Sequence, residues 1–209
     1  FYRAILDVIG KEGTLVFPTH TFSLVKKKKI FDLKKTKCET GIFSEFLRKK
    51  KNTIRQLHPF SSCAAIGKNA KYICSNNTEH VYGPNSPWAR MINLKTKYIS
   101  YGLKPNYACP QVHHAELMMN VPYRSFSKYE QKVKINNKLI KKTFYLFNLK
   151  NKFQNIKRTK NKKIFKNFIK TNNILETKLG VGKIYSYSLK RFYQSNIELL
   201  KKDIFCWMK

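Results

Sequence analysis

The chain is predicted to adopt an α/β fold, because helical and strand patterns alternate along its 209 residues. Three observations lead to this prediction. An amphipathic helical pattern over residues 2–9 precedes a strand pattern at Gly13–Phe17. An apolar stripe at helical spacing marks residues 42–50, and short apolar runs at 63–66 and 98–101 mark two further buried strands. The length is enough to bury a sizeable core, so we expect one domain.

The first half of the chain supplies the clearest elements. The helix over residues 2–9 stops at Gly10, and the strand that follows ends at Pro18–Thr21. Loops at strand ends are where α/β folds commonly hold ligands, so this segment is a candidate binding region. We expect the apolar stripe of the helix over 42–50 to face the core. Its members are Ile42, Phe43, Phe46 and Leu47.

The second half begins with a rigid loop framed by Pro84 and Pro87, and we expect Trp88 at its end to pack rather than to bind a ligand. The turn residues Asn136-Asn137-Lys138 tolerate positive φ and lie between alternating flanks, which predicts a β-hairpin from Val133 to Phe147. Strand pieces are expected around the two glycines of Ile174–Tyr187.

Three further segments complete the chain. Asn151–Lys163 is almost wholly polar and basic, which predicts an exposed loop. Phe165–Ile169 and Leu189–Leu200 carry helical patterns. The chain shows no internal repeat and no phosphate-binding loop of the Gly-rich Lys-Ser/Thr type.

The formal net charge of +32 raises the alternative of a nucleic-acid-binding protein, because phosphate contacts supply affinity in such proteins. The tract Lys150–Lys170 interleaves lysines with phenylalanines, as such a protein would. The excess, however, is lysine spread from end to end, and Asn, Ile, Tyr and Phe are also abundant. These residues share AT-rich codons, so base composition explains the pattern without a selected partner. The runs Lys26–Lys29 and Lys49–Lys51 are interpreted as solvated charge.

The five cysteines are scattered, without a Cys-x-x-Cys pair or a metal-like Cys/His spacing, which predicts reduced structural thiols. Cys109 lies four residues before His113, but Pro110 breaks any helix that would align them as a nucleophilic pair. His113 and His114 are adjacent, so their side chains diverge, and no third ligand is apparent. No metal is therefore predicted.

The run Val112-His113-His114-Ala115-Glu116 carries the strongest chemical pattern. His113 and Glu116 are three residues apart, about one helical turn, so both side chains can point into the same space. A carboxylate placed there can hold the tautomer of the imidazole while the ring takes a proton from a substrate. This chemistry suits the activation of an amine nucleophile. The structural alternative is a solvated ion pair on an exposed helix.

Several blocks accompany this motif in a fixed order. They are Gly13–Thr19, Thr40–Arg48, Arg55–Pro59 with Ser62, Ala64, Ala65 and Gly67, and then Gly83–Trp88 and His113–Glu116. In this order the chain resembles the aminoglycoside 3-N-acetyltransferase family, which is distinct from the GCN5-related acetyltransferases. The resemblance is dense from Gly13 to Arg124, with a last echo around Lys178–Gly182.

The resemblance implies a central mixed sheet flanked by helices and transfer of an acetyl group from acetyl-coenzyme A to an amine on a sugar. It places catalysis on His113 and Glu116, cofactor binding on Arg55, His58 and Thr19, and substrate binding on Ser86 and Arg124. Compared with many relatives, the chain has Gln56 where they carry Ser and Ser61 where they carry a second His, and Asn106–Pro110 is about one residue longer. These departures concern the acceptor side of the pocket.

The sequence begins at Phe1, inside an expected helix, so we expect residues 1–209 to form one acetyltransferase-like domain that lacks an N-terminal segment. The family places a Ser-rich loop there, which helps to bind the coenzyme phosphates. No apolar stretch approaches the roughly 20 residues that span a bilayer, so no membrane partner is expected. A cytoplasmic location is expected, where acetyl-coenzyme A is found. The oligomeric state is left open.

The charge balance also bears on the acceptor. A positive cleft attracts the polyanionic coenzyme and repels a polycationic aminoglycoside. With only 11 acidic residues, a mono-amino sugar or a nucleotide-linked sugar is the more natural acceptor. A catalytically inactive relative remains the other alternative.

Overall fold

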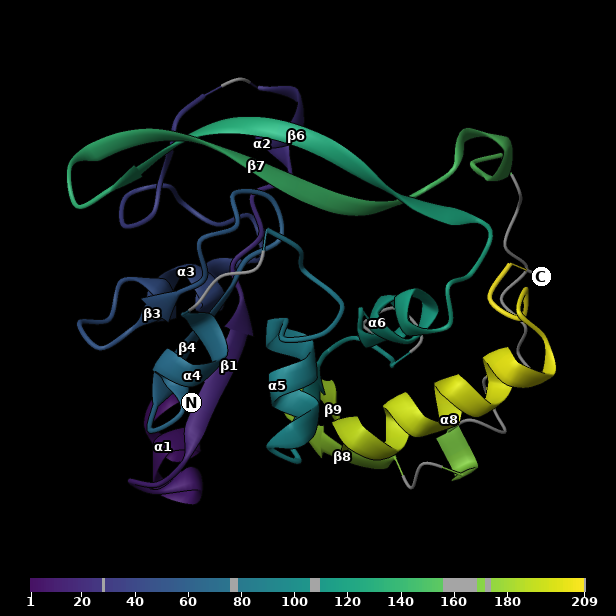
Figure 1. Ribbon diagram of the computed structural model, residues 1–209. Helices are drawn as coiled ribbons and strands as arrows, with labels where there is room; N and C mark the ends of the chain where they lie inside the picture. The colour runs from purple at the N-terminus through teal and green to yellow at the C-terminus, as the bar shows by residue number, and fades with distance from the viewer. Residues whose placement is uncertain (28, 76–78, 106–109, 156–168, 172–173, 209) are drawn as a thin grey trace. The chain divides into compact units, whose positions relative to one another are not determined.

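The computed structural model describes residues 1–27, 29–75, 79–105, 110–155, 169–171 and 174–208 (Figure 1). The chain divides into two compact units. The first, here the N-terminal unit, comprises Phe1–Val81, Asn85–Pro87 and Phe126–Leu146, and the second, the C-terminal unit, comprises Tyr82–Pro84, Trp88–Ser125 and Phe147–Lys209. Helices and strands alternate, and within the described ranges the strands lie in three three-stranded sheets, one of them mixed. The predicted α/β class is confirmed, whereas the single domain stays a prediction.

The N-terminal unit contains α1(Tyr2–Ile9), β1(Thr14–Pro18), α2(Ser23–Lys26), β2(Phe31–Asp32), α3(Ile42–Arg48), β3(Ile54–Arg55), β4(Cys63–Gly67) and α4(Ala70–Cys74). Strand β4 lies between β1 and β3 and is antiparallel to both. Gly67, at the end of β4, has φ +121°. A Cβ there would lie 2.2 Å from the Gly13 carbonyl oxygen, so this close approach requires glycine.

The predicted helix over 42–50 is present as α3, but most of its apolar stripe does not face the core. Leu47 is fully buried, whereas Ile42 is 92% exposed and Phe43 and Phe46 are also exposed. The expectation of a core stripe is therefore wrong for three of its four residues. The reason is that α3 presents only one row to the sheet, and its exposed aromatic rings pack against Phe1 and Tyr2 instead.

The predicted hairpin is confirmed by β6(Arg124–Ile135) and β7(Lys138–Leu149), a long ribbon in Figure 1. Asn136 and Asn137 have φ values of 46° and 66°, the left-handed conformation that the turn residues predict. Strand β2 pairs in parallel with β6, so the β2-β6-β7 sheet is mixed. The core beneath it is apolar and consists of Leu24, Phe31, Leu57, Phe60, Val133, Phe144 and Leu146.

The C-terminal unit contains α5(Pro87–Asn93), β5(Lys97–Tyr101), α6(Gln111–Met118), η1(Asn151–Phe153), β8(Leu175–Leu179), β9(Gly182–Ser188) and α8(Leu189–Lys202), of which Pro87 alone falls in the N-terminal unit. The strand pieces predicted around the two glycines are the hairpin β8–β9. Strand β5 pairs with β9, but the expectation that it is buried is wrong. It is an edge strand, in which Ser100 is buried while Ile99 is 62% exposed.

Helices α6 and α8 pack on each other and on the C-terminal segment. The predicted helix over 189–200 is α8, and the Ser188 hydroxyl caps its N-terminus by accepting a hydrogen bond from the Arg191 amide. The expected loop 151–163 and helix 165–169 fall largely outside the described residues. None of the helices in the described ranges is long and apolar enough to cross a membrane.

The cysteines in the described ranges are free thiols, as predicted: Cys38, Cys63, Cys74 and Cys206. The Sγ atoms of Cys63 and Cys74 lie 3.9 Å apart. Cys109 lies outside the described residues, so its pairing with His113 is not described.

Candidate active site

Helix α6 places His113 and Glu116 on one face, as their spacing predicts. The imidazole Nδ1 of His113 lies 2.6 Å from Glu116 Oε2. Pro110 precedes the helix and does not interrupt it, because its missing N–H falls where no intrahelical partner is available. The two side chains differ in environment. His113 is 32% exposed, while Glu116 is only 2% exposed.

The Glu116 carboxylate has two further partners that follow α6 in the sequence. The Tyr123 hydroxyl donates to Oε1 at 3.0 Å, and Arg124 Nε forms an ion pair with Oε2 at 2.7 Å. A tight turn brings them there, because Asn120 adopts φ 48° and the Val121 amide donates to the Glu116 carbonyl oxygen. The buried carboxylate is therefore satisfied on both oxygens.

These contacts determine the protonation state of Glu116. Burial raises the pKa of this carboxyl, but the hydrogen bond and charge of His113, the Arg124 guanidinium and the Tyr123 hydroxyl outweigh it, and the net pKa lies below the ordinary value. Burial, followed by the Glu116 charge, raises the pKa of Tyr123. At neutral pH the carboxylate is thus ionised and the phenol is protonated.

An ionised carboxylate can only accept hydrogen bonds, so it selects the tautomer of His113 that carries its proton on Nδ1. The Nε2 atom of the neutral ring then holds a lone pair. The ring is partly exposed, and Nε2 is the nitrogen that Glu116 does not contact. This arrangement can take a proton from a weakly acidic group and stabilise the resulting imidazolium through Glu116.

An aromatic wall stands beside His113. The Tyr82 ring packs edge-on against the imidazole, with centroids 5.8 Å apart and an interplanar angle of 79°. Tyr82 also stacks with Trp88, with ring centroids 6.3 Å apart and an interplanar angle of 25°. Trp88 thus packs against an aromatic neighbour, as expected from the sequence.

The two predicted substrate-binding residues have different surroundings. Arg124 is buried against Glu116 and also donates from Nη1 to the Phe147 carbonyl oxygen at 3.2 Å. Ser86 is fully buried and belongs to the N-terminal unit. Their substrate-binding roles stay predictions.

In the N-terminal unit, Arg55 holds together the loop that follows β1. Its guanidinium donates to the carbonyl oxygens of Thr19 at 2.8 Å and Thr36 at 2.6 Å, and to the hydroxyls of Thr21 at 3.1 Å and Ser62 at 3.3 Å. Burial lowers the pKa of Arg55 to about 10, so it remains a cation at neutral pH. Its hydrogen-bond partners are uncharged oxygens, and among the described residues it forms no ion pair, although the charge of Glu45 acts on its pKa.

Thr19 and His58 are also fully buried. The Thr19 and Ser62 hydroxyls lie 2.8 Å apart. His58 Nδ1 accepts from the Ser61 amide at 3.1 Å, and Nε2 lies 3.4 Å from the Tyr145 carbonyl oxygen. Burial lowers the pKa of His58 to about 4, so the ring is neutral. Both residues contact protein atoms, and their cofactor-binding role stays a prediction.

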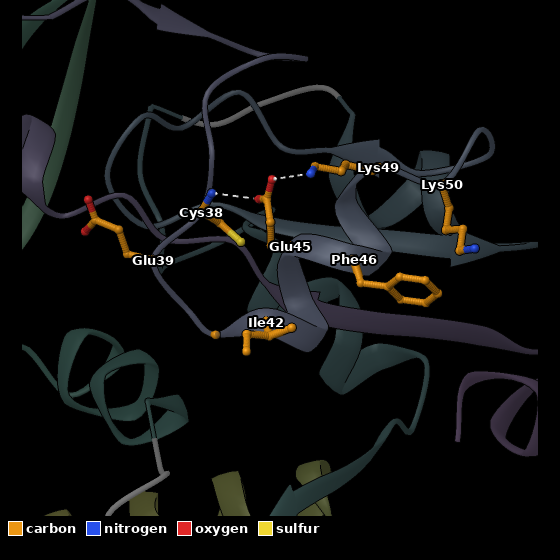
Figure 2. Close-up of a pocket in the computed structure, with 8 residues that line it drawn as sticks. Cys38, Glu39, Ile42, Glu45, Phe46, Lys49 and Lys50 are labelled. Atoms are coloured by element: carbon orange, nitrogen blue, oxygen red, sulfur yellow. Dashed lines mark hydrogen bonds and ion pairs between the residues drawn. The ribbon is translucent and has the colours of Figure 1, made fainter.

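An open hollow of about 650 Å³ lies on α3 and the segment before it. Figure 2 shows the Glu45 carboxylate at its centre, facing Cys38 and Lys49. Glu45 accepts from Arg48 Nε and Nη2, each at 2.7 Å, and from the Cys38 amide at 3.0 Å. The Arg48 hydrogen bond is the main cause that lowers the pKa of Glu45 to about 2. This carboxylate is occupied by protein partners, so we interpret it as a structural anchor.

The structure thus brings His113, Glu116 and Arg124 together in the C-terminal unit. In the N-terminal unit it joins Arg55 to Thr19, while His58 packs against Phe60 and Phe144. Sequence reasoning missed the hydrogen bond of Tyr123 and the contact of Tyr82 with His113. The conspicuous run Val121–Arg124 after the helix was the signal for Tyr123. For Tyr82 its position beside Gly83 was the only signal, because nothing in the spacing connects it to α6.

Comparison with known proteins gives consistent matches. The family model described as aminoglycoside 3-N-acetyltransferase matches residues 1–201. Aminoglycoside N(3)-acetyltransferase VII of Streptomyces paromomycinus is 26% identical over 161 residues, which cover 68% of this chain and 56% of that protein. Aminoglycoside N(3)-acetyltransferase IX of Micromonospora chalcea is 28% identical over 160 residues, 68% and 57% of the two chains. The chain therefore spans little more than half the length of these relatives.

Solved structures show the same fold. Aminoglycoside acetyltransferase AAC(3)-Xa superposes with a TM-score of 0.78 at 20% identity, covering 96% of this chain and 79% of the other. The binary complex of AAC-IIIb with CoASH gives 0.79 at 18% identity, with 96% and 82% covered. Sisomicin-bound AAC-VIa gives 0.80 at 19% identity, with 96% and 83% covered.

Proposed function

The chain belongs to the aminoglycoside 3-N-acetyltransferase family, and we propose that it transfers an acetyl group from acetyl-coenzyme A to an amino group of an aminoglycoside or another amino sugar. The observation that carries this proposal is the pairing of a part-exposed imidazole with a buried, ionised carboxylate at 2.6 Å. That pairing is suited to the deprotonation of an amine.

His113 acts as the general base. The unprotonated acceptor amine attacks the thioester carbonyl, the new C–N bond forms, and His113 Nε2 takes the proton that the nitrogen loses. The C–S bond breaks and the coenzyme leaves as the thiolate, which the imidazolium can reprotonate. We propose that transfer is direct, without an acetyl-enzyme, so that proximity of the two bound substrates supplies much of the rate.

Glu116 is a positioning residue, because it acts on the substrate only through His113. Its hydrogen bond fixes the ring tautomer, and its charge stabilises the imidazolium that forms. Arg124 and Tyr123 in turn hold the carboxylate in place and keep it ionised. We propose that Arg124 influences substrate binding from this position.

Arg55, Thr19 and His58 are proposed to serve the coenzyme. The contacts of Arg55 suggest that it shapes the loop after β1, and its charge, which faces uncharged oxygens, favours an anionic ligand such as a coenzyme phosphate. Thr19 and His58 would act by fixing the same region, because their side chains are buried. The net charge of +32 would speed encounter with the polyanionic coenzyme at low salt.

The acceptor is proposed from two considerations. The names of the curated relatives point to aminoglycosides, whereas the charge of this chain disfavours a polycation. Ser86 is proposed to act on the acceptor side. A comparison of kcat/KM for gentamicin with that for a nucleotide-linked amino sugar tests the choice. We expect the nucleotide-linked sugar to be preferred, and a large preference for gentamicin would contradict the charge argument.

The proposed activity is tested by expressing the protein and measuring free-thiol release from acetyl-coenzyme A with a panel of amines, with mass spectrometry of the product. We expect one N-acetyl group for each thiol released. A folded protein that releases no thiol with any amine would support an inactive relative instead. The family match does not favour the nucleic-acid-binding alternative. We also propose a cytoplasmic location, where acetyl-coenzyme A is available.

A further inference from the structure

The second histidine of α6, His114, has an environment unlike that of His113. It is only 3% exposed, and Tyr193 of α8 packs against its ring with centroids 5.2 Å apart. The Nδ1 atom of His114 accepts a hydrogen bond from the Gly83 amide at 3.2 Å. Burial lowers the pKa of His114 to about 4, so at neutral pH the ring is unprotonated and can accept this bond.

Gly83 lies directly on α6. Its φ is +104°, and a Cβ at this position would lie 3.2 Å from Leu117 Cδ2, so both the backbone conformation and the close packing favour glycine. The residue before it is Tyr82, whose ring is the one that packs edge-on against His113. The hydrogen bond to His114 therefore fixes the segment that carries the aromatic neighbour of the base.

Two contacts from the described part of the chain orient the His113 ring. Glu116 holds Nδ1, but a single hydrogen bond leaves the ring free to tilt about that contact. The edge-on contact with Tyr82, itself stacked with Trp88, restricts this tilt. Together the two contacts determine where Nε2 points, and general-base catalysis depends on that direction.

We propose that His114 is a positioning residue for acetyl transfer, which holds the segment Tyr82–Pro84 on α6 so that Tyr82 orients His113. This inference rests on the proposed function. It assigns a role to a buried histidine that acts through the segment it holds.

Two substitutions at His114 separate the hydrogen bond from the packing. His114→Gln keeps a side-chain acceptor for the Gly83 amide, whereas His114→Leu fills the space without one. We expect the leucine variant to lower kcat by about 10- to 100-fold, the scale on which small misplacements act, with the KM for acetyl-coenzyme A little changed. The glutamine variant should recover most of this loss. Gly83→Ala should reproduce the loss while keeping His114.

A second pair of measurements asks whether the effect passes through Tyr82. Tyr82→Leu should lower kcat by a similar factor, and adding His114→Leu should lower it little further, because both changes disable the same contact. Tyr193→Phe is the matched control. It keeps the ring against His114, and it should leave kcat within about twofold.

Fluorescence supplies a readout that needs no activity. The chain has two tryptophans, so Trp207→Phe leaves Trp88 as the single tryptophan, stacked with Tyr82, and excitation selective for tryptophan reports on it alone. In that background His114→Leu should shift or quench the Trp88 emission in the folded protein, and His114→Gln should restore it. If the wild type turned over no amine, the proposed function would fail, and the emission would still decide whether His114 holds the segment.

The inference is overturned if His114→Leu folds and keeps both kcat within about twofold and the Trp88 emission of its parent. It is also overturned if the losses caused by His114→Leu and Tyr82→Leu simply multiply in the double variant. If the leucine variant does not fold, Gly83→Ala and the glutamine variant give the same comparison.

Discussion

Replacement of Glu116 by glutamine perturbs the centre of the proposed site with almost no change in shape. Among the residues that the structure describes, the carboxylate has three partners, His113 Nδ1 at 2.6 Å, Arg124 Nε at 2.7 Å and the Tyr123 hydroxyl at 3.0 Å. An amide keeps one acceptor oxygen but presents an NH₂ group on the other side. If that group faces His113, it favours the tautomer with the proton on Nε2, which cannot act as a base. If the oxygen faces His113, the NH₂ group faces Tyr123, and the imidazolium loses its counter-charge in either case.

The expected losses in kcat and in unfolding free energy follow from the burial of the carboxylate and from the interactions that a neutral amide cannot make. Loss of the correct tautomer and of the charge should lower kcat by roughly 100- to 10,000-fold. Arg124 would be left with its charge buried and unpaired, which costs about 3–5 kcal/mol in the free energy of unfolding. Initial rates of thiol release and urea denaturation measure the two effects separately.

Tyr123→Phe is the matched control, because it removes one hydrogen bond from the carboxylate and leaves its charge. We expect it to cost about 1–2 kcal/mol in unfolding free energy and to lower kcat by less than about tenfold. A Glu116→Gln variant that folds and turns over at nearly the wild-type rate would refute the role assigned to this carboxylate.

Three predictions concern stability. Burial lowers the pKa values of His58 and His114 to about 4, so between pH 6.5 and 4 the unfolded chain binds more protons than the folded protein. The unfolding free energy should therefore fall as pH drops from 6.5 to 4, by up to about 3 kcal/mol per pH unit for the two histidines together. Urea titrations at several pH values check this, and a flat profile would contradict it. Gly67→Ala should lower the unfolding free energy by at least about 2 kcal/mol in urea unfolding, because the new Cβ would clash with the backbone of Gly13. Wild-type stability in this variant would show that the two backbone segments lie further apart than the 2.2 Å between this Cβ and the Gly13 carbonyl oxygen implies. On α3, Leu47→Ala should lower the unfolding free energy by about 2–5 kcal/mol and Ile42→Ala by less than about 0.5 kcal/mol, also measured by urea unfolding. Equal losses would show that Ile42 faces the core as the sequence predicted.

Local chemistry explains which parts of the fold were predictable. The α6 motif and the hairpin turn depend on interactions between near neighbours, so the spacing of His113 and Glu116 and the turn preference of Asn136 and Asn137 were sufficient. The exposure of Ile42 could not be predicted in this way. Its periodicity indicates a helix, but which side of that helix meets the sheet is decided by segments far away in the sequence.

The candidate site shows the same division. The pairing of His113 with Glu116 follows from helical geometry, but the partners of that carboxylate depend on a tertiary turn after α6. Arg124, expected on the substrate side, lies against Glu116 because the turn at Asn120 reverses the chain. The contact of Tyr82 depends on a hydrogen bond between backbone and a distant side chain, which no local pattern encodes.

The central claim is that His113 removes a proton from the acceptor amine, and the most direct test is kcat for His113→Ala with saturating acetyl-coenzyme A and the best acceptor found. The variant should fold like the wild type, since His113 is part-exposed, and its kcat should fall by roughly 100- to 10,000-fold. Turnover close to the wild-type rate in that variant would contradict the claim.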